Sequence, residues 1–158
     1  MHEVVQIVAK DFIILPLLLM IITWWRLERQ QKRRFIILAI LSGVLAGALA
    51  VLASHLYKDP RPFVVGHFRP YFPHGADNGF VSDHTLLGIW AAAITLVYSR
   101  RLGWLALVLA LLVGLARVVA GVHHLVDIIA AAVISVGSVL IMKQVLKALA
   151  RTRQKNAS

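Results

Sequence analysis

Five long apolar runs alternate with short polar segments along this chain. The runs cover about residues 12–25, 35–57, 84–99, 102–121 and 125–142. An α-helix needs about 17–25 mostly apolar residues to cross the hydrocarbon core of a bilayer, so the shorter runs are expected to extend into their polar flanks. The pattern predicts an all-α fold, an integral membrane bundle of about five transmembrane helices.

The first apolar run and the two ends of the chain carry local features. Residues 1–10 are expected to form a short interfacial helix or to begin the first span early. Pro16 predicts a kink in that span. Trp24 and Trp25 stand where a signal peptidase would need small residues, so the span is expected to remain as an anchored helix. Residues 148–158 are expected to form a basic cytoplasmic tail.

Composition narrows the class of protein. The chain has 158 residues, of which 59% are hydrophobic, which indicates one membrane-embedded domain over residues 1–158. The net charge of +10 would suggest nucleic acid in a soluble protein, but here the basic residues lie at the ends of apolar runs, so no nucleic-acid partner is expected. The absence of cysteine excludes disulfides and thiol chemistry.

The distribution of positive charge predicts an orientation. Twelve of the seventeen Lys and Arg residues fall on the side that holds the 26–34 turn, the 100–101 turn and the C-terminal tail. The positive-inside rule makes that side cytoplasmic. The segment 58–83 and the turn around residue 123 are then expected to face outward, on the extracytoplasmic side of the membrane.

Three polar clusters stand at the ends of spans on this outer side. They are residues 58–62 (Lys-Asp-Pro-Arg-Pro), residues 82–84 (Ser-Asp-His), and Arg117 with His123 and Asp127. Positions four apart share one face of a helix, so a carboxylate at 127 can orient an imidazole at 123. An arginine can bind an oxyanion bidentately, and a helix N-terminus at Ser82 or Asp83 favours an anion. Such groups are costly in a bilayer, so together they indicate a site for a phosphate ester or diphosphate.

The clusters resemble the three-part signature of the type 2 phosphatidic acid phosphatase family of integral membrane lipid phosphatases. The residues that match, over about residues 35–140, are Arg61 and Pro62, Ser82 and His84, and Arg117, His123 and Asp127. Ser-Asp-His and the Pro-Arg-Pro-Phe stretch at 60–63 resemble in particular the bacterial undecaprenyl-diphosphatase branch of the bacitracin-resistance type. That family usually has six spans, against the five counted here.

The chain departs from the signature at four positions. Ser54 stands where the family has a lysine, and Lys58 or Arg69 are the candidates to supply that charge. The other departures are Val81 for proline, Asp83 for glycine and Ala116 for serine.

The resemblance implies an enzyme that hydrolyses the terminal phosphate of undecaprenyl diphosphate through a phosphohistidine. It assigns His123 as nucleophile, Asp127 as its orienting acid and His84 as general acid and base. The expected phosphate-binding residues are Arg61, Arg117, Ser82, Asp83 and Lys58. The arginines supply the positive charge, so no metal and no cofactor are expected. The expected partners are the lipid phosphate substrate and membrane lipids, with no obligate protein partner.

Other interpretations remain open at this point. The substrate would alternatively be phosphatidic acid, phosphatidylglycerol phosphate or lipid A. A metal site on His123 and Asp127 would take further ligands from His84, Asp83 or His74. A small anion-binding transporter or channel without chemistry is the alternative from another class. The remaining imidazoles are expected to be solvated or packing residues (His2, His55, His67 and His74), with His124 an interfacial neighbour.

Overall fold

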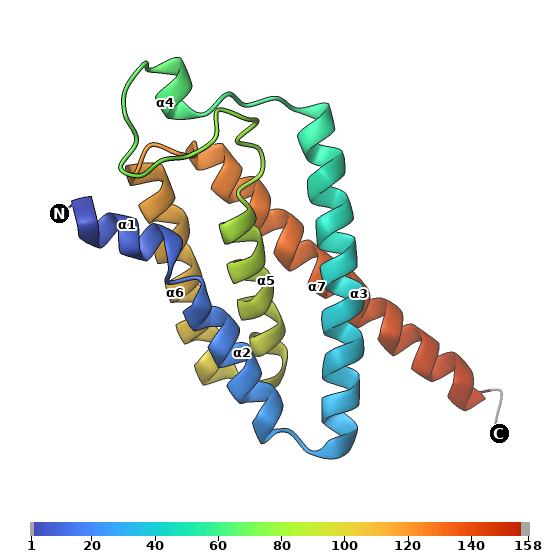
Figure 1. The fold of residues 1–158 in the computed structure, drawn as a ribbon. Helices are drawn as coiled ribbons and strands as arrows, with labels where there is room; N and C mark the ends of the chain where they lie inside the picture. Colours follow the sequence, from blue (N-terminus) through green and yellow to red (C-terminus); the bar gives the residue numbers. More distant parts are fainter. Residues whose placement is uncertain (1, 156–158) are drawn as a thin grey trace.

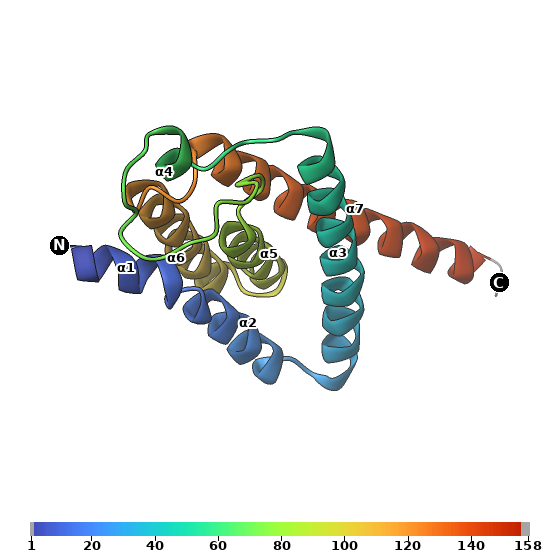
Figure 2. The same ribbon diagram turned by 45° about the horizontal axis from the view of Figure 1, so that its top comes forward.

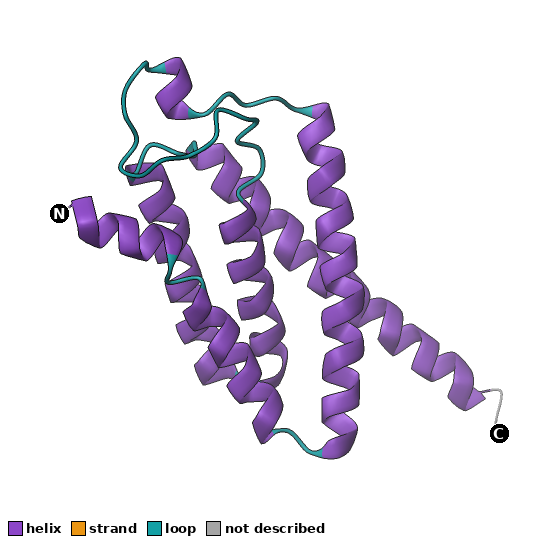
Figure 3. Ribbon diagram, viewed as in Figure 1, coloured by secondary structure: helices purple, strands orange, loops and turns teal. Residues whose placement is uncertain are grey.

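The computed structural model describes residues 2–155 and contains only helices, turns and loops over that range. In chain order the helices are α1 (His2–Lys10), α2 (Ile14–Arg26), α3 (Arg29–Leu56), α4 (Pro62–Val65), α5 (Asp83–Tyr98), α6 (Arg100–Val119) and α7 (Leu125–Lys155). Figure 3 shows the same elements with the connecting loops in teal. The predicted all-α fold is confirmed.

Four helical stretches are long and apolar enough to cross a membrane: residues 2–26, 29–56, 100–119 and 125–152. The helix α5 is a shorter apolar helix of 16 residues. With α5 counted, these stretches match the five spans expected from the sequence. The chain is therefore a helical membrane bundle.

The helix α5 lies at the centre of the bundle and contacts α2, α3, α6 and α7 (Figures 1 and 2). Its sequence is apolar on every face, which is typical of a helix surrounded by others. Ile89, Ala91, Ala92 and Ile94 are 0–1% exposed, and the two alanines allow neighbouring helices to approach closely. Side chains on the outward faces of α3 and α6 are instead large, apolar and exposed, as expected for contact with lipid.

The first span is interrupted before Pro16 and not kinked at it. The chain turns at residues 11–13, and α2 starts at Ile14, so Pro16 lies in the first turn of a new helix. The first N–H groups of a helix have no partner within it, so the missing donor of proline costs little there. The kink expected at Pro16 is therefore replaced by a break at residues 11–13, a few positions earlier in the same span.

The last helix is longer than its apolar run. Residues 143–155 continue α7 as helix, where the sequence predicted a span ending near 142 and a tail over 148–158. Lysine and arginine are good helix formers, so the loss of apolar character does not end the helix. Residues 156–158 of the expected tail lie outside the described residues. The final part of α7 extends beyond the rest of the bundle (Figure 1).

Candidate active site

The three polar clusters meet at one end of the bundle. There α3 and α6 end, α5 and α7 begin, and the long segment between α4 and α5 crosses above them (Figure 1). Five of the expected site residues are at most 6% exposed: Arg61, Ser82, Arg117, His123 and Asp127. Burial of several ionisable groups in one place is uncommon unless they are paired or serve a function.

The turn between α6 and α7 positions His123. It passes through Gly121, whose φ of +76° is in the left-handed region that glycine adopts freely. A Cβ at this position would lie 2.5 Å from the ring of Phe68, so a larger residue would also displace the segment above the site. The turn places the His123 ring one helical turn before Asp127.

His123 and Asp127 form a hydrogen-bonded pair. The Nδ1–H of His123 donates to Asp127 Oδ2 at 3.1 Å, and the same oxygen accepts the backbone N–H of His124 at 2.9 Å. With the proton on Nδ1, the lone pair of Nε2 faces away from the carboxylate. Burial lowers the pKa of His123, against the opposing effect of the hydrogen bond to Asp127, so the ring is neutral at pH 7. The pair is built as an oriented nucleophile or base.

Arg61 covers the open nitrogen of this imidazole. It follows α3 and precedes α4, where Pro62 begins that helix. Its Nη1 donates to the carbonyl of Val122 at 2.9 Å and lies 3.3 Å from Nε2 of His123. Its Nε donates to Oδ1 of the exposed Asp77 at 2.8 Å, and this bond lowers the pKa of the Asp77 carboxyl. The guanidinium therefore places a positive charge directly beside Nε2 of His123.

Arg117, in the last turn of α6, provides a second guanidinium. Its Nη1 donates to the carbonyl of Ala9 in α1 at 3.2 Å, and its Nη2 lies 3.0 Å from Nε2 of His74. Its Nε is buried and has no hydrogen-bond partner among the described residues. An unsatisfied buried donor costs about 1–3 kcal/mol, and a phosphate oxygen would satisfy it.

The start of α5 contributes Ser82 and His84. Ser82 precedes the helix and is fully buried, and its backbone N–H approaches the carbonyl of Asp127 at 3.5 Å. Its hydroxyl accepts a hydrogen bond from Thr85 at 3.1 Å and keeps its own proton available. His84 is half-buried, and the charge of Arg117 acts on it.

Three expected or candidate binding residues stay outside this hydrogen-bonded network. Asp83 is exposed on the first turn of α5, within electrostatic range of Arg117. Lys58 and Arg69 are both exposed, and neither makes a hydrogen bond or ion pair with another described residue. Ser54 takes the place of a lysine in the family signature. Neither Lys58 nor Arg69 supplies that positive charge within the hydrogen-bonded network.

His74 also belongs to this network, although the sequence predicted a solvated or packing residue. His74 comes from the segment between α4 and α5, bonds Arg117 and has its ring centroid 6.2 Å from that of His123. Burial and the charges of Arg61 and Arg117 lower its pKa, so it is neutral and accepts from the guanidinium. No periodicity marks this segment in the sequence, so the contact between His74 and Arg117 could not be predicted from it.

Asp59 and His124 form a second layer behind Asp127. The Nδ1 of His124 lies 3.0 Å from Asp59 Oδ2, and Asn78 accepts the backbone N–H of Asp59 at 2.8 Å. Burial and the nearby charge of Asp127 raise the pKa of Asp59. Asp59 lies two positions before Arg61, and this proximity is the sequence feature that indicates a place near the site.

The arrangement of possible metal ligands differs from the one considered from the sequence. Asp59, His124 and Asp127 have ligand atoms within 4.8 Å of one another. The Nε2 of His123 faces Arg61 and lies outside this group. A cation near two guanidinium groups would be repelled, so the site suits an anion better.

Comparisons with known proteins agree with this chemistry. The model of one family, described as the PAP2 superfamily, matches residues 33–151. The undecaprenyl-diphosphatase BcrC of Bacillus subtilis is 29% identical over 133 residues, 84% of this chain and 68% of that protein. The bacitracin transport permease protein BcrC of Bacillus licheniformis is 30% identical over 141 residues, 89% of this chain and 69% of that protein.

A solved structure shares the fold. LpxE of Aquifex aeolicus aligns with a TM-score of 0.68 and 20% sequence identity, over 90% of this chain and 83% of that one. The family match covers all three polar clusters, from Arg61 to Asp127. This chain belongs to the PAP2 superfamily.

Proposed function

We propose that this chain is a membrane phosphatase that removes the terminal phosphate of a lipid diphosphate, with undecaprenyl diphosphate as first choice. The observation that supports this proposal most directly is the orientation of the His123 ring. Its Nδ1 is hydrogen-bonded to Asp127, and its Nε2 faces Arg61. An imidazole oriented in this way, beside a cation, is suited to attack phosphorus. The name of the Bacillus subtilis relative supports the choice of substrate.

In the proposed reaction, Nε2 of His123 attacks the terminal phosphorus as the bond to the bridging oxygen breaks. His84 donates its proton to the leaving lipid phosphate. Water then attacks the phosphohistidine and gives a proton to His84, which releases inorganic phosphate and restores both imidazoles. Asp127 stabilises the positive charge that the His123 ring carries in the intermediate.

Arg61 and Arg117 are proposed to bind the non-bridging oxygens, whose negative charge grows in the transition state. To do so, Arg61 gives up its contact with His123, and Arg117 uses the buried Nε that lacks a partner. The Ser82 hydroxyl, at the start of α5, is proposed to donate a hydrogen bond to the same phosphate. Because two guanidinium groups supply the charge, the proposal needs no metal.

Phosphate release by the purified protein tests this function. We expect release from undecaprenyl diphosphate to exceed release from undecaprenyl phosphate, phosphatidic acid and phosphatidylglycerol phosphate by at least about tenfold in kcat/KM, unchanged by a chelator. Preference for one of the other lipids would retain the phosphatase and change its substrate. An anion transporter without chemistry would release phosphate from none of them, and that result would contradict the proposal.

We further propose that the site faces the extracytoplasmic side of a bacterial inner membrane, because most cations lie at the opposite end. The chain has no cysteine, so single cysteines replacing Gly75 and Ala150 give a clean labelling experiment. An impermeant thiol reagent is expected to label position 75 in intact cells, and position 150 only after permeabilisation. Labelling of position 150 alone in intact cells would reverse the orientation.

A further inference from the structure

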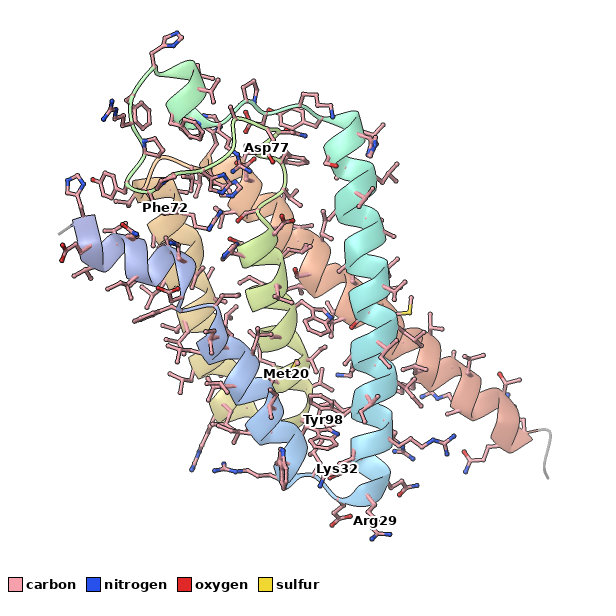
Figure 4. The ribbon with its side chains drawn as sticks, in the orientation of Figure 1. Met20, Arg29, Lys32, Phe72, Asp77 and Tyr98 are labelled. Atoms are coloured by element: carbon pink, nitrogen blue, oxygen red, sulfur yellow. The ribbon has the colours of Figure 1, made fainter. Side chains whose placement is uncertain are left out.

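A large cavity lies at the end of the bundle opposite the active site. It has a volume of about 970 Å³ and opens between α3, the end of α5 and α7. Tyr98, one of its lining residues, lies far from Asp77 in Figure 4, near the turn where α3 begins. Ligand sites commonly have volumes of about 300–1,000 Å³, so this cavity is at the upper end of that range.

The lining combines an apolar wall with four cations. The apolar residues include Ile37, Leu38, Val97 and Leu146, and the cations are Arg33, Arg34, Lys143 and Lys147. Lys143 and Lys147 are one helical turn apart on α7, so both lysines face the same cavity. No aspartate or glutamate lines the cavity.

The four cations are not neutralised by any carboxylate between residues 2 and 155. None of them makes an ion pair with a described carboxylate. Four of the seven acidic residues, Asp59, Asp77, Asp83 and Asp127, belong to the active-site end instead. A groove with this much uncompensated charge attracts an anion.

A smaller apolar cavity adjoins the first. It has a volume of about 240 Å³, lies between α5, α6 and α7, and shares Val97 and Lys143 with the larger cavity. Apart from Lys143, its lining residues are apolar, and they include Ala93, Val136 and Leu140. A cationic groove that continues into an apolar slot matches a molecule with a charged head and a hydrocarbon chain.

We propose that this groove binds one anionic diacyl phospholipid of the phosphatidylglycerol type. Arg33, Arg34, Lys143 and Lys147 bind the phosphate, and an acyl chain occupies the smaller cavity. Basic pockets between transmembrane helices at the cytoplasmic face are suited to anionic headgroups. A second copy of the chain is disfavoured, because an isologous contact would bring the two sets of cations together.

The test measures binding of phosphatidylglycerol and phosphatidylcholine to the full-length protein in a neutral detergent. We expect phosphatidylglycerol to bind the wild type at least about tenfold more tightly. The paired variants Arg33→Gln/Arg34→Gln and Lys143→Gln/Lys147→Gln are each expected to weaken that binding by about 25-fold, at roughly fivefold for each cation removed.

A matched control removes the same charge from the same end of the bundle. Arg100→Gln/Arg101→Gln changes two exposed cations that do not line the cavity, and is expected to alter affinity by less than about twofold. Equal losses in the control and the groove variants would show diffuse attraction and overturn the site. Equal affinity for the two lipids would also overturn it, as would a dimer that the groove variants dissociate.

A second variant tests the chain slot without changing charge. Val136 lines the smaller cavity and is 39% exposed, so Val136→Phe is tolerated by the fold while it fills the slot. Binding of phosphatidylglycerol is expected to weaken by at least about fivefold, with the melting temperature of the lipid-free protein unchanged. An unchanged affinity would remove the chain slot from the proposal.

Discussion

His123→Ala is expected to reduce kcat for lipid phosphate hydrolysis by at least about a thousandfold. The substitution removes Nε2, the atom that faces Arg61 and is proposed to attack phosphorus. Arg61 and Arg117, the proposed phosphate-binding residues, are unchanged in this variant, so the loss is expected in kcat more than in KM. Initial rates of phosphate release at saturating substrate measure the effect.

A matched control for this variant is His55→Ala. His55 is an exposed imidazole on α3, and its Nδ1 lies 2.7 Å from the carbonyl oxygen of Val51 in the same helix. Its removal is expected to leave kcat within about twofold, since exposed positions away from the site have small effects. A His123→Ala protein that melts like the wild type and retains more than a few per cent of its activity would exclude this residue as nucleophile.

Asp127→Asn is expected to lower kcat by about a thousandfold or more while the chain still folds. The carboxylate accepts hydrogen bonds from the His123 ring and from the backbone of His124 at one oxygen. The amide oxygen of asparagine can take the place of Oδ2 and accept both bonds, but the neutral side chain would not stabilise the positive charge that the His123 ring carries in the proposed intermediate.

The comparison for this variant is Asp11→Asn, in the exposed turn between α1 and α2. It removes the same charge at a distance from the dyad and is expected to leave kcat within about twofold. Activity of the Asp127→Asn protein above about a tenth of wild type would show that the negative charge of Asp127 is not needed to stabilise the His123 ring.

The sequence predicts the helices well because membrane spans need long apolar runs, and those runs are visible without tertiary information. The errors lie where the apolar pattern is not the deciding factor. The break at residues 11–13 depends on how α1 packs against α6, and the extension of α7 depends on the helix propensity of basic residues.

The site follows the same division. Residue spacing and family signature identify Arg61, His123 and Asp127, because each has a fixed place relative to a helix end. His74 and Asp77 lie in the segment between α4 and α5, which has no regular period, so their contacts with the two arginines depend on the path of a loop. Site residues whose positions are fixed by helix ends can therefore be predicted from the sequence, and site residues that lie in loops cannot.

Arg117 is held in part by the carbonyl oxygen of Ala9, a main-chain atom of the first helix. The contact uses no side-chain atom of Ala9, which is fully buried, so another small residue at position 9 would offer the same oxygen. The first helix therefore supports Arg117 through its main chain, and the type of side chain at position 9 does not reveal this role. Deleting the first ten residues would therefore damage the enzyme more than any single exchange among them.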